Sequence, residues 1–98
     1  MKFAYKKYDT KEERMLAIAD SDIVGKHFEE GDLQLEVTGE FYHESECGDE
    51  EALKMINDAS LINATGNNII SLLLKENIID EDKILRVGGV AHAQVIKL

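Results

Sequence analysis

The residues best suited to chemistry lie near the C-terminus, in the segment GGVAHAQ at residues 88–94. A glycine pair lets backbone amides approach an anion closely, and His92 and Gln94, two positions apart on a strand, share one face. These residues could therefore bind a small ligand. Gly88 and Gly89 also supply the positive φ angles that a tight hairpin turn requires, and this simpler interpretation is favoured.

The segment NATGNN is a second candidate. Asn63, Gly66 and the first amides of a following helix could bind a carboxylate or phosphate, because helix N-termini leave donors unpaired and carry partial positive charge. If the sheet brings this segment near His92, a small anionic ligand could bind there, with Asp20 as a candidate base at the end of an apolar strand. The simpler interpretation is that Asn63 or Thr65 caps the helix that follows NATGNN, and that Asp20 forms a turn or caps a separate short helix at DSDIVG.

Metal binding and covalent catalysis find little support in the sequence. His43 and Cys47 supply only half of a zinc ligand set. Neighbouring carboxylates raise the pKa of a thiol such as that of Cys47 and make it a poor nucleophile. No G-x-S-x-G signature occurs. We therefore predict no metal site and no cofactor, and favour a binding module over an enzyme.

Composition narrows the classes of partner. The 98 residues predict one compact domain over residues 1–98. With 11 Lys and Arg against 20 Asp and Glu, the net charge of −9 repels a phosphate backbone. Nucleic acid is therefore an unfavourable partner, except for weak contacts through Lys2, Lys6 and Lys7. A single cysteine, no leader-like segment and no long apolar run predict a cytoplasmic protein that does not enter a membrane.

The acidic segment EFYHESECGDEE surrounds Phe41 and Tyr42. Exposed aromatic groups among acids would suit a protein partner with a basic patch, such as a component of translation or ribonucleoprotein machinery. The alternative is an acidic solvated loop whose aromatic side chains fold inward, and this alternative is favoured.

Alternation and helical spacing predict the elements that must position these residues. Residues 2–8 form a strand, and in DLQLEVT the side chains of Leu33, Leu35 and Val37 face inward. Residues 14–19 fit a helix or a buried strand equally well. Helices are predicted over residues 49–59 and 65–77, followed by a strand in DEDKILRV and a last strand in AQVIKL.

The helix at 65–77 carries too many apolar residues for one narrow stripe, which predicts either a central position or a contact between two copies. Strands, two helices separated by a short apolar connection, and further strands predict an α+β fold. Its two layers are a mixed or antiparallel sheet and two main helices packed on one face.

Four segments, in order ADSDIVGKHFEEGDLQLEV, EFYHES, INATGNN and GGVAHAQVIKL, resemble a small archaeal family known as domain of unknown function four-two-four. The resemblance implies no established activity. It implies that residues 14–19 form a strand, because relatives carry β-branched residues and then Cys-Asp here, with Asp20 matching that aspartate. Asn63 and Gly66 match the family's N-x-x-G pattern. The chain departs from the family at Ala19, commonly cysteine, and at Ala91, commonly proline.

Overall fold

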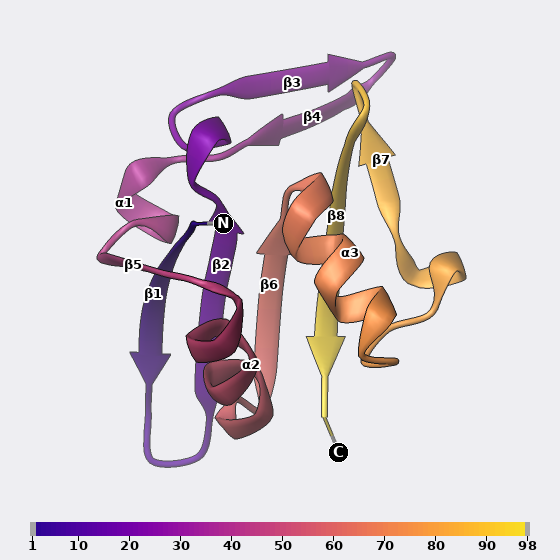
Figure 1. Cartoon of the computed structure of the whole chain (residues 1–98). Coiled ribbons are helices and arrows are strands. Elements are labelled where there is room, and N and C mark those ends of the chain that lie inside the picture. Colours follow the sequence, from indigo (N-terminus) through magenta and orange to yellow (C-terminus); the bar gives the residue numbers. More distant parts are fainter. Residues whose placement is uncertain (1, 98) are drawn as a thin grey trace.

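A computed structural model describes residues 2–97, in which a six-stranded mixed sheet and a separate two-stranded hairpin form the framework (Figure 1). The order in the large sheet is β5-β1-β2-β6-β8-β7, and β3 pairs with β4. The strands are β1 Phe3–Asp9, β2 Arg14–Asp20, β3 His27–Glu30, β4 Leu33–Glu36, β5 Ser45–Cys47, β6 Leu61–Thr65, β7 Leu85–Val87 and β8 Val90–Ile96.

The helices are α1 Gly39–Tyr42, α2 Asp49–Asp58 and α3 Asn67–Lys75, with 3-10 turns η1 Ser21–Ile23 and η2 Glu81–Lys83. Both α2 and α3 lie on one face of the large sheet, as predicted (Figure 1). Between them and the sheet is the main core, whose fully buried members include Leu16, Ile18, Ile56, Ile62 and Ile69. The predicted α+β class is confirmed.

The connection predicted between the two helices is instead the central strand β6. It pairs in parallel with β2 and antiparallel with β8, so both of its backbone edges are hydrogen-bonded inside the sheet. Ile62 and Ala64 point into the helix-covered core, while Asn63 and Thr65 point to the opposite face. The predicted helix at 65–77 therefore begins two residues later, at Asn67.

Several other predictions are settled by the structure. Residues 14–19 lie within strand β2, and the strand at 2–8 and the helix at 49–59 are present as β1 and α2. In β4 the prediction was wrong for Leu33, which is 43% exposed. The β3–β4 hairpin projects beyond the main sheet, so that Leu35 packs against Val87 and Val90 and Leu33 does not.

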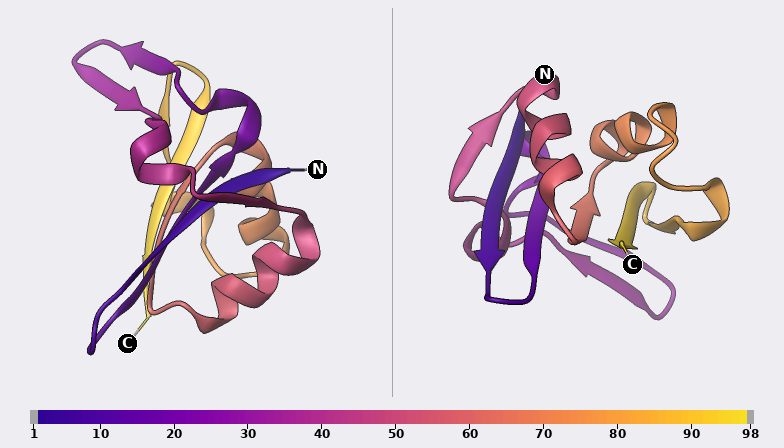
Figure 2. Two further views of the ribbon diagram at one scale, coloured as in Figure 1. Left: turned by 90° about the vertical axis from the view of Figure 1, so that its left-hand side faces the viewer. Right: turned by 90° about the horizontal axis from the view of Figure 1, so that it is seen from below.

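The second sheet face is covered at one end only. There α1 and the β3–β4 hairpin pack on it, burying Ala17, Ala19, Val37 and Tyr42 (Figure 2, left). Toward the other end no element of residues 2–97 covers the strands. We call this uncovered region the open face. By strand register two cross-strand rows border it, Lys6, Ala17, Asn63 and Gln94, and Tyr8, Met15, Leu61 and Ile96. Helix α1 covers part of both rows, because Ala17 is buried and Lys6 and Tyr8 contact Glu40 and Phe41, whereas Gln94 and Ile96 are exposed.

Candidate functional site

Asp20 occupies the N-terminus of α3. Its carboxylate accepts hydrogen bonds from the amides of Asn68 (3.0 Å) and Ile69 (2.9 Å), and its side chain is only 4% exposed. Burial raises the pKa of this carboxyl, and the two amide hydrogen bonds oppose that rise. The donors that were predicted to face a bound anion are thus engaged by a carboxylate of the chain itself.

Gly66 lets Asp20 reach these amides. Its φ of +128° lies outside the range that L side chains favour, and a Cβ atom at this position would stand 2.3 Å from the Asp20 Cγ. The Gly66 amide donates to the carbonyl of Ala91 on β8, and its carbonyl accepts from Ile70 in α3. Gly66 therefore joins strand to helix while leaving room for the capping carboxylate.

A chain of polar groups lies on the other face of the sheet. The Tyr42 hydroxyl donates to Asn63 Oδ1 (2.6 Å) and lies 2.8 Å from the Thr65 hydroxyl, which in turn is 2.7 Å from His92 Nδ1. Thr65 and Tyr42 are buried, and Asn63 and His92 are half-buried. The cluster links α1 to β6 and β8 across a distance of twenty or more residues in sequence.

Each hydroxyl has one proton, and this fixes the direction of the chain. Because Tyr42 gives its proton to Asn63, the hydrogen bond between the hydroxyls must be donated by Thr65. Thr65 then has no proton left for His92, so His92 Nδ1–H donates to Thr65 Oγ1. The neutral ring consequently presents Nε2 as a hydrogen-bond acceptor.

Burial controls the ionisation of this cluster. It lowers the pKa of His92 below its ordinary value of 6.5 and raises the pKa of Tyr42 above 10.0. Both shifts favour the neutral forms that the proton count requires. The cluster can therefore donate and accept hydrogen bonds near neutral pH without carrying charge.

The five residues proposed for an anion site do not surround one pocket. Asp20 and Gly66 meet at the start of α3 on the helix-covered face, whereas Asn63, His92 and Gln94 point to the opposite face. Asn63 and Gln94 are cross-strand partners, as are Thr65 and His92. The structure therefore divides the site into a helix cap and a polar cluster, and anionic-ligand binding stays a prediction.

The terminal glycine pair forms the predicted hairpin turn between β7 and β8. Gly88 and Gly89 have φ angles of +58° and +82°, the signs that a two-residue type I′ turn needs. The Gly88 amide donates to the Glu30 carboxylate (2.9 Å), and Asn67 Nδ2 donates to the Gly89 carbonyl (3.0 Å). Contacts within the chain thus engage both glycines.

Phe41 and Tyr42, the aromatic residues predicted to contact a partner, differ in their exposure to solvent. Tyr42 is 3% exposed and belongs to the polar cluster, so it cannot be a surface contact in this conformation. Phe41 is half-buried and stacks on Tyr8 with ring centroids 5.4 Å apart. The aromatics of this acidic segment fold inward, as the alternative interpretation had it.

Other candidates remain dispersed. Lys2 lies 3.6 Å from a Glu46 carboxylate oxygen, which offsets its charge, and Lys6 donates to the backbone carbonyl of Glu40. Burial and nearby carboxylates raise the pKa of the Cys47 thiol to about 11. Within residues 2–97, no three His, Cys, Asp or Glu side chains lie close enough together to hold a metal ion.

Two residues of the site were not predicted. Thr65 was treated only as a helix cap, although it joins Tyr42 to His92. Asn67 donates to Gly89 and accepts from the Ala91 amide (2.9 Å), tying α3 to the last hairpin. The alternation of Asn63 and Thr65 with Ile62 and Ala64 was a signal for Thr65, because alternate polar residues in an apolar run indicate a strand with one polar face.

Fold and site together define a small α+β protein whose mixed sheet has helices on one face and a half-buried polar cluster on the other. The chain belongs to the family described as "Protein of unknown function (DUF424)", which matches residues 8–98. This confirms the resemblance in the four sequence segments.

A solved structure described as "an uncharacterized conserved protein from Methanopyrus kandleri", an archaeon, is similar in fold. Its TM-score is 0.81 at 24% identity, over 100% of this chain and 95% of that chain. The likeness shows the fold. Comparison with curated proteins gives no match. None of the helices described in residues 2–97 is both long and apolar enough to cross a membrane.

Proposed function

We propose that this protein is a cytoplasmic binding or adaptor module that contacts a protein partner through its open face. The observation that carries the proposal is that one face of the sheet is covered by helices along its length and the other face is covered only in part. Helices α2 and α3 bury one face, whereas on the other α1 and the β3–β4 hairpin cover one end only (Figure 2). At the uncovered end Ile96 is 68% exposed, and on β7, opposite His92, Leu85 is 46% exposed.

The composition of the open face supports protein contact. Its row Tyr8, Met15, Leu61 and Ile96 offers partly exposed apolar surface, and in the adjacent row the exposed side chain of Gln94 offers hydrogen-bonding groups. Lys6 and Asn63 in that row already bond to Glu40 and Tyr42. An apolar centre beside polar groups is typical of protein interfaces. A net charge of −9 favours a basic partner by electrostatic attraction, such as a component of translation or ribonucleoprotein machinery.

Site-specific photocrosslinking tests this function. A photoreactive amino acid is placed at Lys6, at Gln94, and as a control at Lys54, which is exposed on α2 on the helix side. In native lysate, Lys6 and Gln94 are expected to capture the same basic protein and Lys54 is not. Capture from all three positions, or from Lys54 alone, would contradict a partner on the open face.

A further inference from the structure

Strand β8 is longer than the strand beside it. β7 pairs with β8 only from Val90 to His92, and before Leu85 the chain turns away through η2 (Figure 1). The remaining segment, Gln94–Ile96, pairs with β6 on one side and has no strand of residues 2–97 on the other. It is therefore an outer edge of the sheet.

Backbone groups at this edge point to solvent. The Lys97 amide donates to the Ser60 carbonyl, and the Ala91 carbonyl accepts from Gly66, so odd-numbered residues of β8 face β6. In an antiparallel ladder the alternate residues face the other way. The N–H and C=O groups of Gln94 and Ile96 thus point outward, and within residues 2–97 no hydrogen bond from another element meets them.

Apolar surface accompanies these free groups. A pocket of about 240 Å³ lies beside the edge, lined by Gln94, Val95 and Ile96 on β8 and by Ile78, Ile79, Asp80 and Lys83 on the segment before β7. Side chains of an added strand would alternate between this pocket and the open face. Side chains on one side of the added strand would meet Ile78 and Ile79 in the pocket, and those on the other side would meet Ile96 at the open face.

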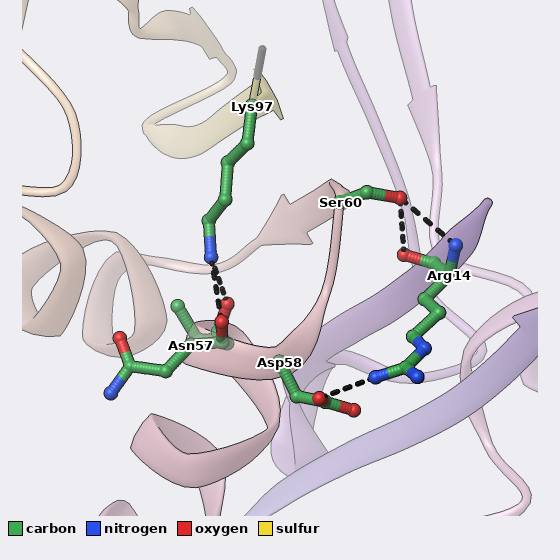
Figure 3. Close-up of polar contacts among 6 residues, drawn as sticks. Arg14, Asn57, Asp58, Ser60 and Lys97 are labelled. Atoms are coloured by element: carbon green, nitrogen blue, oxygen red, sulfur yellow. Dashed lines mark hydrogen bonds and ion pairs between the residues drawn. The ribbon is translucent and has the colours of Figure 1, made fainter. Parts of the chain in front are cut away.

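Natural proteins protect such edges with proline or with a lysine at the strand. This chain contains no proline, and the lysine that follows β8 in sequence is engaged elsewhere, while Lys83 lies across the pocket on the segment before β7. Lys97 Nζ donates to the carbonyls of Ile56 and Asn57 at the end of α2, on the helix-covered side (Figure 3). The side chain of Lys97 therefore anchors the end of β8 and does not lie along its outer edge.

We propose that the Gln94–Ile96 edge of β8 binds an extended, basic segment of a protein partner by strand addition, antiparallel to β8 and in line with β7. The inference rests on the proposed function, for which it names the mode of contact. Exposed main-chain donors and acceptors supply affinity in such complexes, and pockets for alternate side chains supply selectivity.

Charge decides the kind of partner. Residues 76–86, which lie beside the edge and lead into β7, carry four carboxylates, one lysine and one arginine, a net charge of 2 − 4 = −2, and Arg86 pairs with Glu81 (2.8 Å). The pocket places this segment within a Debye length of an added strand, about 10 Å at 0.1 M salt. A basic segment is attracted to it. A second copy of this chain, paired edge to edge, would bring another segment of the same negative charge to the same place.

The probe is a synthetic peptide, acetyl-KVKVKVK-amide, titrated into the full chain while hydrogen exchange of backbone amides is followed by NMR. Binding is expected to slow exchange at Gln94 and Ile96 by about tenfold or more, because these amides gain hydrogen-bond acceptors. The acidic analogue, acetyl-EVEVEVE-amide, is expected to give no protection. Equal protection by both peptides would overturn the assignment of a basic partner.

Two N-methylated versions of the probe test pairing through the main chain. One is methylated at every valine amide and the other at every lysine amide, so charge and side chains are the same. Because alternate amides face opposite edges of a strand, only one version is expected to lose binding, by about tenfold or more. Equal affinity of both, or absence of binding by the unmodified probe, would overturn strand addition.

A variant of the chain provides the reciprocal test. Gln94→Pro removes an outward N–H without removing a hydrogen bond to β6, and Gln94→Ala changes only the side chain. The proline variant is expected to bind about tenfold more weakly than the alanine variant, because both lose the glutamine side chain and only the proline variant loses the N–H. If the proline variant fails to fold, the methylated peptides still decide the question.

These results are separable from those for the proposed function. Lys6 on β1 lies three strands from β8, about 14 Å at the usual strand spacing, so a strand added at the edge does not cover it. Crosslinks from Lys6 together with failed peptide pairing would retain the open face as the interface and reject strand addition. Amide protection at Gln94 and Ile96 without added peptide, rising with protein concentration, would instead identify a second copy as the occupant.

Discussion

At the residue scale, Asp20 ties the end of β2 to the start of α3 through two backbone hydrogen bonds. Its own burial costs free energy, which these bonds offset. An asparagine of the same shape would present a donor group to one of the two amides and leave that amide unsatisfied. The cap is thus specific for a group with two acceptor oxygens.

Asp20→Asn is expected to lower the free energy of unfolding by about 2 kcal/mol, the usual cost of an unsatisfied buried donor. Urea denaturation at neutral pH measures the change. Asp22→Asn, at an exposed position in η1, serves as the control and should shift stability by less than about 0.5 kcal/mol. Equal effects of the two substitutions would contradict the capping role of Asp20.

His92 makes the stability of the protein depend on pH. Burial holds its pKa below 6.5 in the folded state, so below pH 6.5 the unfolded chain binds a proton more readily than the folded chain does. Stability contributed by neutral His92 is complete above pH 6.5 and is lost as pH falls toward the folded pKa. Wild type is therefore expected to lose stability with acidification in this window.

His92→Gln keeps a donor for Thr65 and cannot titrate. The stability advantage of wild type over this variant is expected to shrink as pH falls from about 7.5 to about 5. The loss is at most about 1.4 kcal/mol for each pH unit that separates the folded pKa of His92 from its unfolded pKa. Thermal denaturation across this range measures it. Gln94→Ala, a non-titrating change on the same strand face, should parallel wild type. An advantage that grows with acidification would refute the assignment.

At the scale of elements, the junction between β6 and α3 depends on one backbone conformation. Gly66→Ala would place a methyl group against the Asp20 carboxylate and also strain φ. We expect a loss of about 3 kcal/mol or more, combining strain with disruption of the cap. Denaturant unfolding is the measurement.

Gly25→Ala is the matched control for Gly66→Ala. Its φ of +90° is also positive, but no atom lies within 4 Å of the added Cβ. Only strain applies there, so a cost of about 1 kcal/mol is expected. If the two substitutions were equally costly, the close approach of Asp20 to Gly66 would not be the reason for glycine.

Elements that are specified by a sequence pattern within a few neighbouring residues were predictable. The acidic first turn and apolar spacing of α2, the alternation of β1 and the glycine pair of the last turn all lie within a few residues of sequence. β6 was missed because five residues between two helices read as a connection. Its strand state depends on β2 and β8, which lie far from it along the chain.

The candidate site shows the same division. His92 and Gln94 were correctly placed on one face, because alternation on a strand is local. The separation of Asp20 from His92 was not predictable, since it depends on which neighbours flank β6 and on which side α3 packs. The partnership of Tyr42 with Thr65 likewise requires α1 to fold back over the second face.

At the scale of the whole molecule, the two faces of the sheet have different chemistry. The helix-covered face is largely apolar and holds the main core, so its groups contribute stability. The second face combines buried alanines, a neutral polar cluster and partly exposed aliphatic side chains. Stability and recognition are therefore assigned to opposite sides of one sheet, and substitutions on the open face should alter binding more than folding.

This arrangement also predicts the oligomeric state. The many apolar residues of α3, which could have indicated a contact between copies, are packed within the chain. Ile69, Ile70 and Leu73 are buried, and Leu72 and Leu74 pack against the main core. With a net charge of −9, copies repel one another at low salt. The protein is expected to be a monomer of 11.0 kDa at micromolar concentration.

Light scattering after gel filtration measures that mass, at low salt and again near 0.5 M, where the Debye length falls to about 4 Å. A monomer at both salt concentrations means that the exposed Ile96 and Leu85 are too small a patch to hold two copies together. Twice the monomer mass at high salt alone would show self-association limited by charge. In that case Ile96→Lys, which places a charge at the edge of β8, should restore the monomer if copies meet there, whereas Leu33→Lys on the projecting hairpin should not.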